Sequence, residues 1–184
     1  MTTNRYRTET VTGPASEPLT LTEVKSYLRI DASDEDALLT TLITSAREHA
    51  ELHLNRRLIT QTIDLFIDCS DRGVFIGLQL PIGPVQSITE VAGIDAEDGT
   101  EELLDPARYD QDGNSLVFAE SGTVERLRVR YQVGYGAGLD VPSAIKTGML
   151  IHVAALYEHR GVAALPEQSA KLYRSYINYS HLLT

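Results

Sequence analysis

The feature that most restricts the fold of this chain is a change of hydrophobic period that occurs twice. Before Leu58 the apolar residues recur every three or four positions, as on one face of an α-helix. From Leu58 to Val133 they alternate with polar residues, as in β-strands that bury one face. After Gly134 the helical period returns. The pattern predicts an α+β fold, with two N-terminal and two C-terminal helices in a bundle and a small antiparallel β unit between them.

The first helical part, residues 18–57, is expected to contain two helices. Thr20 and Glu23 have the spacing of a capping box at the start of the first. Ser33 is expected to cap the second, whose apolar residues step by three and four as far as Asn55. Residues 1–17 lack hydrophobic periodicity and are rich in Thr, Pro, Gly and Ser, so we expect a flexible N-terminal arm.

The β-rich insertion, residues 58–133, and the C-terminal helical part, residues 134–184, complete one structural domain. Strands are expected at 59–67, 74–80, 85–91, 115–118 and 127–133. Pro142 suits the first turn of a third helix that ends near Arg160. A fourth helix is expected to reach the end of the chain with a single apolar stripe, formed by Leu172, Tyr176, Tyr179 and Leu183.

Composition excludes several classes of protein. The formal net charge is −10, which disfavours a dedicated nucleic-acid binder that holds phosphates on a basic face. Cys69 is the only cysteine, so an internal disulfide and a cysteine-ligated zinc site are excluded. There is no apolar run of the length that a membrane span needs, about 18 residues, and no signal-peptide core near the N-terminus. We expect a cytoplasmic protein that does not cross a membrane.

Patterns that could support catalysis or metal binding each fail at a required position. The segment 110–121 begins like a calcium loop, but Ser115 and Ser121 stand where that loop needs glycine and glutamate, so it predicts a hairpin turn. The three glycines of 134–138 have the wrong spacing for a phosphate-binding loop and indicate a strand-to-helix joint. His49 and His53 supply at most two metal ligands. We therefore predict no catalytic, cofactor-binding or metal-binding residues.

Two charged clusters remain as candidate contacts. The acidic turn, formed by Asp34, Glu35 and Asp36, is favoured by the dipole of the helix that it begins. The arginine face, formed by Arg126, Arg128 and Arg130, lies on one side of a strand because its residues alternate with apolar ones. The arginine face is either a solvated sheet surface or a contact for an acidic protein surface or a phosphate backbone.

Six strings along the chain share their order and spacing with one protein family. They are PLTLTEVKSYLRI at 18–30, DALLTTLITSAREHAE at 36–51, NRRLITQT at 55–62, LPIGPVQSITEV at 80–91, VRYQVGY at 129–135, and the helix 142–160 ending in LYEHR. In this order they resemble the head-to-tail connector (adaptor or head-completion) family of long-tailed bacteriophages and gene transfer agents. The resemblance covers nearly the whole chain.

The resemblance implies a structural protein without enzymatic activity. Its copies, about twelve, would form a ring beneath the portal protein through heterologous contacts. The ring would join the capsid to a tail-side stopper or tail-terminator protein and let DNA pass through its lumen without specific binding. Such a protein would be found in the bacterial cytoplasm during assembly and then in the neck of the particle.

Within that picture, helices 34–55 and 142–160 would build the ring, and two sets of residues are candidate contacts. The apolar stripe of the fourth helix (Leu172, Tyr176, Tyr179, Leu183) would dock into the portal, unless it packs on the third helix of its own chain. The acidic turn of one copy would face the arginine face of the next. The alternatives are another ring component, such as a stopper or tail-completion protein, or a small-ligand-binding domain or enzyme at the glycine joint.

Overall fold

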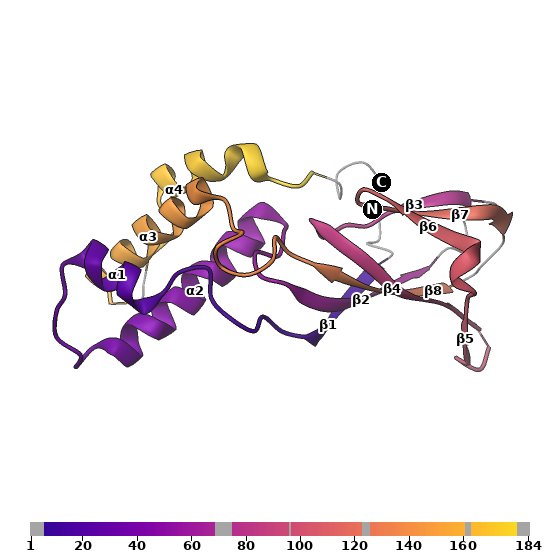
Figure 1. The fold of residues 1–184 in the computed structure, drawn as a ribbon, viewed down its shortest axis with the longest axis horizontal. Coiled ribbons are helices and arrows are strands. Elements are labelled where there is room, and N and C mark those ends of the chain that lie inside the picture. The colour runs from indigo at the N-terminus through magenta and orange to yellow at the C-terminus, as the bar shows by residue number, and fades with distance from the viewer. Residues whose placement is uncertain (1–5, 69–74, 96, 123–125, 161–162, 180–184) are drawn as a thin grey trace.

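The structure is a computed structural model that describes residues 6–68, 75–95, 97–122, 126–160 and 163–179. Its helices are α1 (Leu21–Leu28), α2 (Asp36–Leu54), α3 (Ser143–Glu158) and α4 (Glu167–Tyr173), with short 3₁₀ helices at Pro106–Arg108 and Arg174–Tyr176. Its strands are β1 (Tyr6–Thr12), β2 (Gln61–Asp68), β3 (Phe75–Gln79), β4 (Val85–Ile94), β5 (Glu101–Leu103), β6 (Tyr109–Asp112), β7 (Ser115–Gly122) and β8 (Arg126–Val133). The helices lie at one end of an elongated molecule and the strands at the other (Figure 1). The predicted α+β class is confirmed.

The strands form two antiparallel sheets that enclose one hydrophobic cluster. The larger sheet has the order β1-β2-β8-β4-β5, and the smaller has the order β3-β7-β6. Alternate residues of β2 and β8 point toward the smaller sheet, so that Leu65 and Val129 are fully buried with Leu116 of β7. The hairpin predicted near residue 113 is confirmed, since β6 and β7 pair across the Gly113-Asn114 turn.

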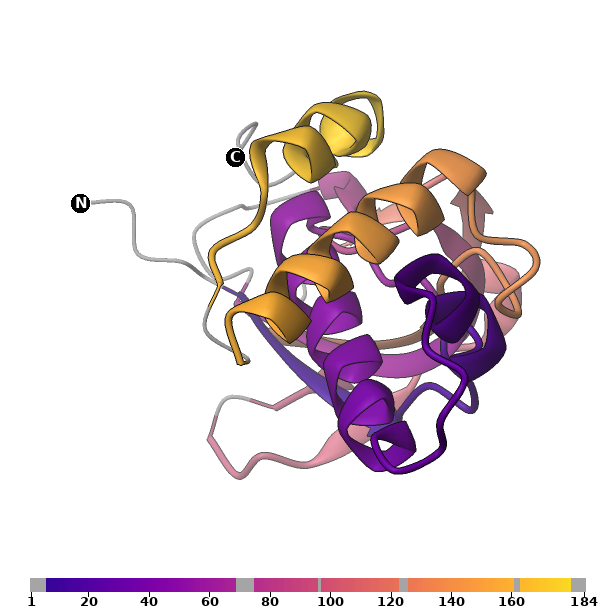
Figure 2. The ribbon, with the colours of Figure 1, turned by 90° about the vertical axis from the view of Figure 1, so that its left-hand side faces the viewer.

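The helices enclose a second hydrophobic cluster, whose members include Leu39 and Ile43 of α2 and Met149 and Val153 of α3. The helices α3 and α4 cover α2 from one side, and α1 lies beside them (Figure 2). The capping box predicted at the start of α1 is confirmed, because Thr20 and Glu23 exchange both hydrogen bonds.

The prediction that Ser33 caps the second helix is wrong. The helix begins at Asp36, its N-cap is Glu35, and no side chain caps it. The acidic turn therefore precedes the helix for the most part, and its side chains are available for contacts with other elements.

The prediction of a flexible arm over residues 1–17 is wrong for residues 6–12. These residues form β1, which pairs with β2 along its length. Strand β1 lies at the sheet edge, where most of its side chains are exposed and only Tyr6 packs against the β cluster. An edge strand needs no alternation of apolar residues, and so it left no hydrophobic signal in the sequence.

The prediction of a fourth helix that reaches the end of the chain is also wrong. Helix α4 ends at Tyr173, a 3₁₀ turn follows, and the backbone is extended at Ile177. Buried Asn178 explains the ending. Its N–H donates to the carbonyl of Leu54 at 2.8 Å, and its side-chain amide donates to the carbonyl of Pro81 at 3.1 Å.

Backbone hydrogen bonds join the two halves of the molecule. We call this junction the waist; it comprises residues 55–60, 81–86, 134–136 and 176–178. The N–H of Arg57 donates to Gly83 at 3.0 Å, and the N–H of Thr60 donates to Gly136 at 2.9 Å. The waist fixes the orientation of the helical half relative to the β half, because several crossings of the chain bond one another there.

Candidate interaction surfaces

The acidic turn is tied to its own helical half. The ammonium of Lys25 lies 2.7 Å from Asp36, and the hydroxyl of Tyr157 donates to Glu35. This hydrogen bond raises the pKa of Tyr157. Asp34 is the exposed member of the turn. The turn thus links α1 and α3 to the start of α2.

The arginine face lies on the surface of the larger sheet that points away from the smaller one. Arg130 donates two hydrogen bonds of 2.8 Å to Asp64, and these raise its pKa. Arg128 is buried and donates to Glu101 at 2.8 Å and to Glu90 at 3.1 Å. Although burial lowers the pKa of Arg128, these hydrogen bonds raise it on balance.

Two of the three arginines therefore bridge strands within one chain, while Arg126 is exposed. The structure does not bring the arginine face and the acidic turn together, because they lie in different halves of the molecule.

The residues predicted to dock into the portal separate into different environments. Leu172 and Tyr176 are partly buried against the helical cluster, whereas Tyr179 is 53% exposed. Leu183 lies outside the described residues. Tyr173, which the predicted stripe omitted, is fully buried against α3, where Gly148 leaves room for its ring.

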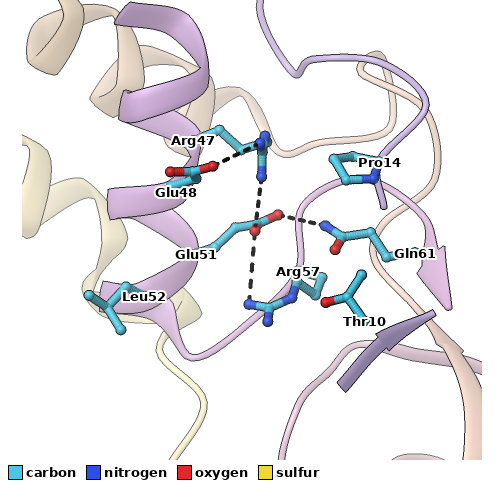
Figure 3. Close-up of a pocket in the computed structure, with 8 residues that line it drawn as sticks. All are labelled: Thr10, Pro14, Arg47, Glu48, Glu51, Leu52, Arg57 and Gln61. Atoms are coloured by element: carbon cyan, nitrogen blue, oxygen red, sulfur yellow. Dashed lines mark hydrogen bonds and ion pairs between the residues drawn. The ribbon is translucent and has the colours of Figure 1, made fainter. Parts of the chain in front are cut away.

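A polar site centred on Glu51, next to the waist, was not predicted from the sequence. Buried Glu51 accepts a hydrogen bond from the N–H of Leu58 at 2.9 Å. It also accepts hydrogen bonds from Gln61 and Arg47, each at 3.2 Å (Figure 3). Burial raises the pKa of Glu51, while the Leu58 hydrogen bond and the charges of Arg47 and Arg57 oppose that rise. Arg47 and Glu51 are one helical turn apart, and this spacing was the available signal.

This polar cluster forms the floor of an open pocket of about 320 Å³ between α2 and the end of β1. Leu52 is also among the lining residues and is 82% exposed. Arg57 also lines the pocket (Figure 3). The pocket thus combines an exposed apolar side chain with a guanidinium group.

The glycine joint does not form a phosphate cradle. The N–H of Gly134 donates to Pro84, that of Tyr135 to Leu58, and that of Ala137 to the carboxylate of Asp140. These three donors are already satisfied by the protein. Gly134 has a φ of 122°, and a Cβ there would lie 2.5 Å from the carbonyl oxygen of Ile59. The glycine therefore permits close packing of two backbone segments.

The histidine pair predicted on the second helix is divided between two contacts. His49 stacks on His152 of α3 with ring centroids 5.0 Å apart, and His53 lies against Tyr173. Burial, together with the neighbouring His49, lowers the pKa of His152. Among the described residues, no three His, Cys, Asp or Glu side chains gather in a way that could hold a metal ion.

Among the described residues, no helix is long and apolar enough to span a membrane. A family model for phage gp6-like head-tail connector proteins matches residues 18–121. The chain belongs to this family of head-tail connectors, which are structural proteins and not enzymes.

Solved structures share the fold. A chain of the neck of a native gene transfer agent particle, computed with twelvefold symmetry, is 21% identical with a TM-score of 0.75. A chain of the neck of the empty particle, computed with sixfold symmetry, is 20% identical with a TM-score of 0.73. In both cases the match covers 92% of this chain and 94% of the other. No curated protein sequence matches the chain significantly.

Proposed function

We propose that the chain forms a ring of about twelve copies in the neck of a phage-like particle, beneath the portal protein. The observation that supports this proposal is the shared fold. This chain, a member of the connector family, matches over 92% of its length a chain from a neck computed with twelvefold symmetry. The ring would form in the bacterial cytoplasm and then join the capsid to a tail-side stopper or tail-terminator protein.

The charge of the chain supports a role as a DNA conduit. A net charge of −10 repels the phosphate backbone, so the lumen would let DNA pass without holding it. Arg128 and Arg130, which could attract phosphate, are engaged by carboxylates of their own sheet.

We assign portal docking to the end of the C-terminal segment, from Tyr179 onward. Tyr176 packs against the helical cluster and Asn178 is fixed at the waist, whereas Tyr179 is exposed. Tyr179 and the residues that follow, including Leu183, are the part of the predicted stripe that we propose for the portal contact.

The pairing of acidic turn and arginine face between copies stays a prediction. The contacts within the chain restrict it to the exposed members, Asp34 and Arg126. Reversing the charge of Arg126 should then weaken ring assembly at low salt. Unchanged assembly and unchanged salt dependence of this variant would exclude the pairing.

The ring is tested by affinity purification of a tagged chain from cells that produce particles, with mass spectrometry of the recovered proteins and negative-stain imaging. We expect a portal-sized protein and ring-shaped averages. Recovery of the chain alone, from cells shown to assemble particles, would overturn the proposal. Recovery with tail proteins but without portal would favour the stopper or tail-completion alternative.

A further inference from the structure

The loop 136–140 carries a leucine whose side chain is exposed to solvent. Leu139 is 93% exposed, the largest value among the large apolar side chains of the described residues. The loop is nevertheless fixed, because the N–H of Thr60 donates to Gly136 and the N–H of Asp140 donates to Ala137, each at 2.9 Å. An apolar side chain on an ordered loop can be covered with little loss of conformational entropy.

The same loop is packed against the chain that precedes α1. A Cβ at Gly138 would lie 2.7 Å from the carbonyl oxygen of Glu17, and the next apolar residue, Val141, is buried. Leu139 therefore projects from a rigid base. Beside it Asp140 is exposed; one oxygen of its carboxylate accepts the N–H of Ala137 at 2.7 Å, and the other oxygen can accept a further donor.

The pocket beside Glu51 offers a complementary pair of groups, an exposed leucine and an arginine. Leu52, one of its lining residues, is the second most exposed large apolar side chain of the described residues, at 82%. Arg57 forms one ion pair within the described part of the chain, a long one of 3.9 Å to Glu51. Because Glu51 is already bonded by other donors, the Arg57 guanidinium can accommodate a further carboxylate.

The loop and the pocket are separate patches on the surface of one chain. The loop and the C-terminal end of α2, which lines the pocket, lie at a similar height along the long axis of the molecule (Figure 1). They belong to different sides: viewed along that axis, segment 134–142 runs along one side and β1, whose end borders the pocket, along the other (Figure 2). A ring of identical subunits needs two different and complementary patches on each subunit.

We infer that the loop 136–140 of one copy packs on the pocket of the next copy, with Leu139 against Leu52 and Asp140 facing Arg57. This inference rests on the proposed ring and names the surfaces that would build it. The occupant is a second copy of this chain because the two surfaces match in both apolar contact and charge.

Cysteine cross-linking tests the contact in cells that produce particles. In a C69S background, the double variant L52C/L139C should give a ladder of covalent multimers after oxidation. Either single variant should give no ladder, and neither should the control pair L52C/L103C, which uses an exposed leucine of β5. A ring seen by negative stain without a ladder would overturn the inferred contact and leave the ring proposal intact. Failure of every variant, and of the unmodified chain, to join particles would instead overturn the proposed function.

Polar substitutions provide a second test. L139Q and L52Q should each weaken the association between copies roughly tenfold or more, with L103Q as the matched control without effect. Both side chains are exposed, so the midpoint of thermal unfolding should stay unchanged. Assembly of L139Q and L52Q at the level of the unmodified chain would contradict the inference. A cross-link from L52C to a different particle protein would also contradict it, because the pocket would then serve another partner.

Discussion

The helical half and the β half of this connector protein bury separate hydrophobic clusters, and they place their charges differently. In the helical half, buried Glu51 of α2 pairs with Arg47 and also accepts hydrogen bonds from Leu58 at the waist and from Gln61 of β2. In the β half, Asp64, Arg128 and Arg130 connect neighbouring strands across the outer surface of the larger sheet. The first set therefore holds two halves together, whereas the second stiffens one sheet.

The largest expected effect comes from matched truncations of the two clusters. L39A and L127A each remove a fully buried leucine, one from α2 and one from β8. Each should lower the free energy of unfolding by about 2–5 kcal/mol. Because backbone bonds at the waist couple the halves, both variants should shift a single transition in urea, followed by far-UV circular dichroism and tyrosine fluorescence. Two separate transitions would show that the halves unfold independently.

The two charge clusters should differ in their cost when one partner is removed. E51A leaves Arg47 with Glu17 and Glu48, but it removes the acceptor that the buried N–H of Leu58 and the buried amide of Gln61 share, so we expect a loss of about 3 kcal/mol. D64A leaves Arg128 with Glu90 and Glu101, so the loss should be smaller, about 1.5 kcal/mol. Urea denaturation of both variants measures the difference, and an equal or larger loss for D64A would contradict this ranking.

Two tyrosines of the C-terminal segment should differ in their effects on stability and on portal docking. Y176A should lower the free energy of unfolding by about 1–2 kcal/mol, because its ring packs on the helical cluster. Y179A should change it by less than about 0.5 kcal/mol, because that side chain is 53% exposed. If Tyr179 contacts the portal, Y179A should instead reduce the recovery of portal with the tagged chain. Reduced thermal stability of Y179A with normal portal recovery would refute the docking role.

The smallest effect is a dependence on pH that should come from the helical half. Burial keeps His152 neutral by lowering its pKa below 6.5, so the unfolded chain binds a proton more readily. The stabilising contribution is therefore complete above about pH 6.5 and declines as the pH falls, by at most about 1.4 kcal/mol per pH unit.

The measurement for His152 is thermal unfolding between pH 7.5 and 5, in the unmodified chain and in H152Q. The variant should show a shallower dependence on pH. Glu23, whose pKa a backbone hydrogen bond from Thr20 lowers to about 2, changes its charge in the folded state well below this range. Identical slopes for the two proteins would contradict the assignment to His152.

The elements with a strong local signal were predicted well. The capping box at Thr20, the long amphipathic α2 and the alternating strands β2 and β8 all have patterns that neighbouring residues determine. Strands β1, β5 and β6 were not predicted. Their side chains are mostly exposed, so burial imposed no pattern on the sequence.

The contact residues were also predicted only as far as local pattern allows. Alternation placed Arg128 and Arg130 on one sheet face, but their partners Asp64, Glu90 and Glu101 come from other strands, and no spacing along the chain relates them. The pocket at Glu51 likewise combines α2, β1 and β2. Local pattern shows which side chains share a face, and strand order decides which of them meet.

Local patterns were enough to predict the α+β class, the strand-rich middle and the family, because hydrophobic period, caps and turns are local and the family strings keep their order. Contacts between distant segments, in contrast, make β1 part of the larger sheet, end the last helix at Asn178, and leave Leu139 and Leu52 exposed. The physical reason is that these outcomes depend on pairing between segments distant in the chain, whose energies no single stretch of residues contains.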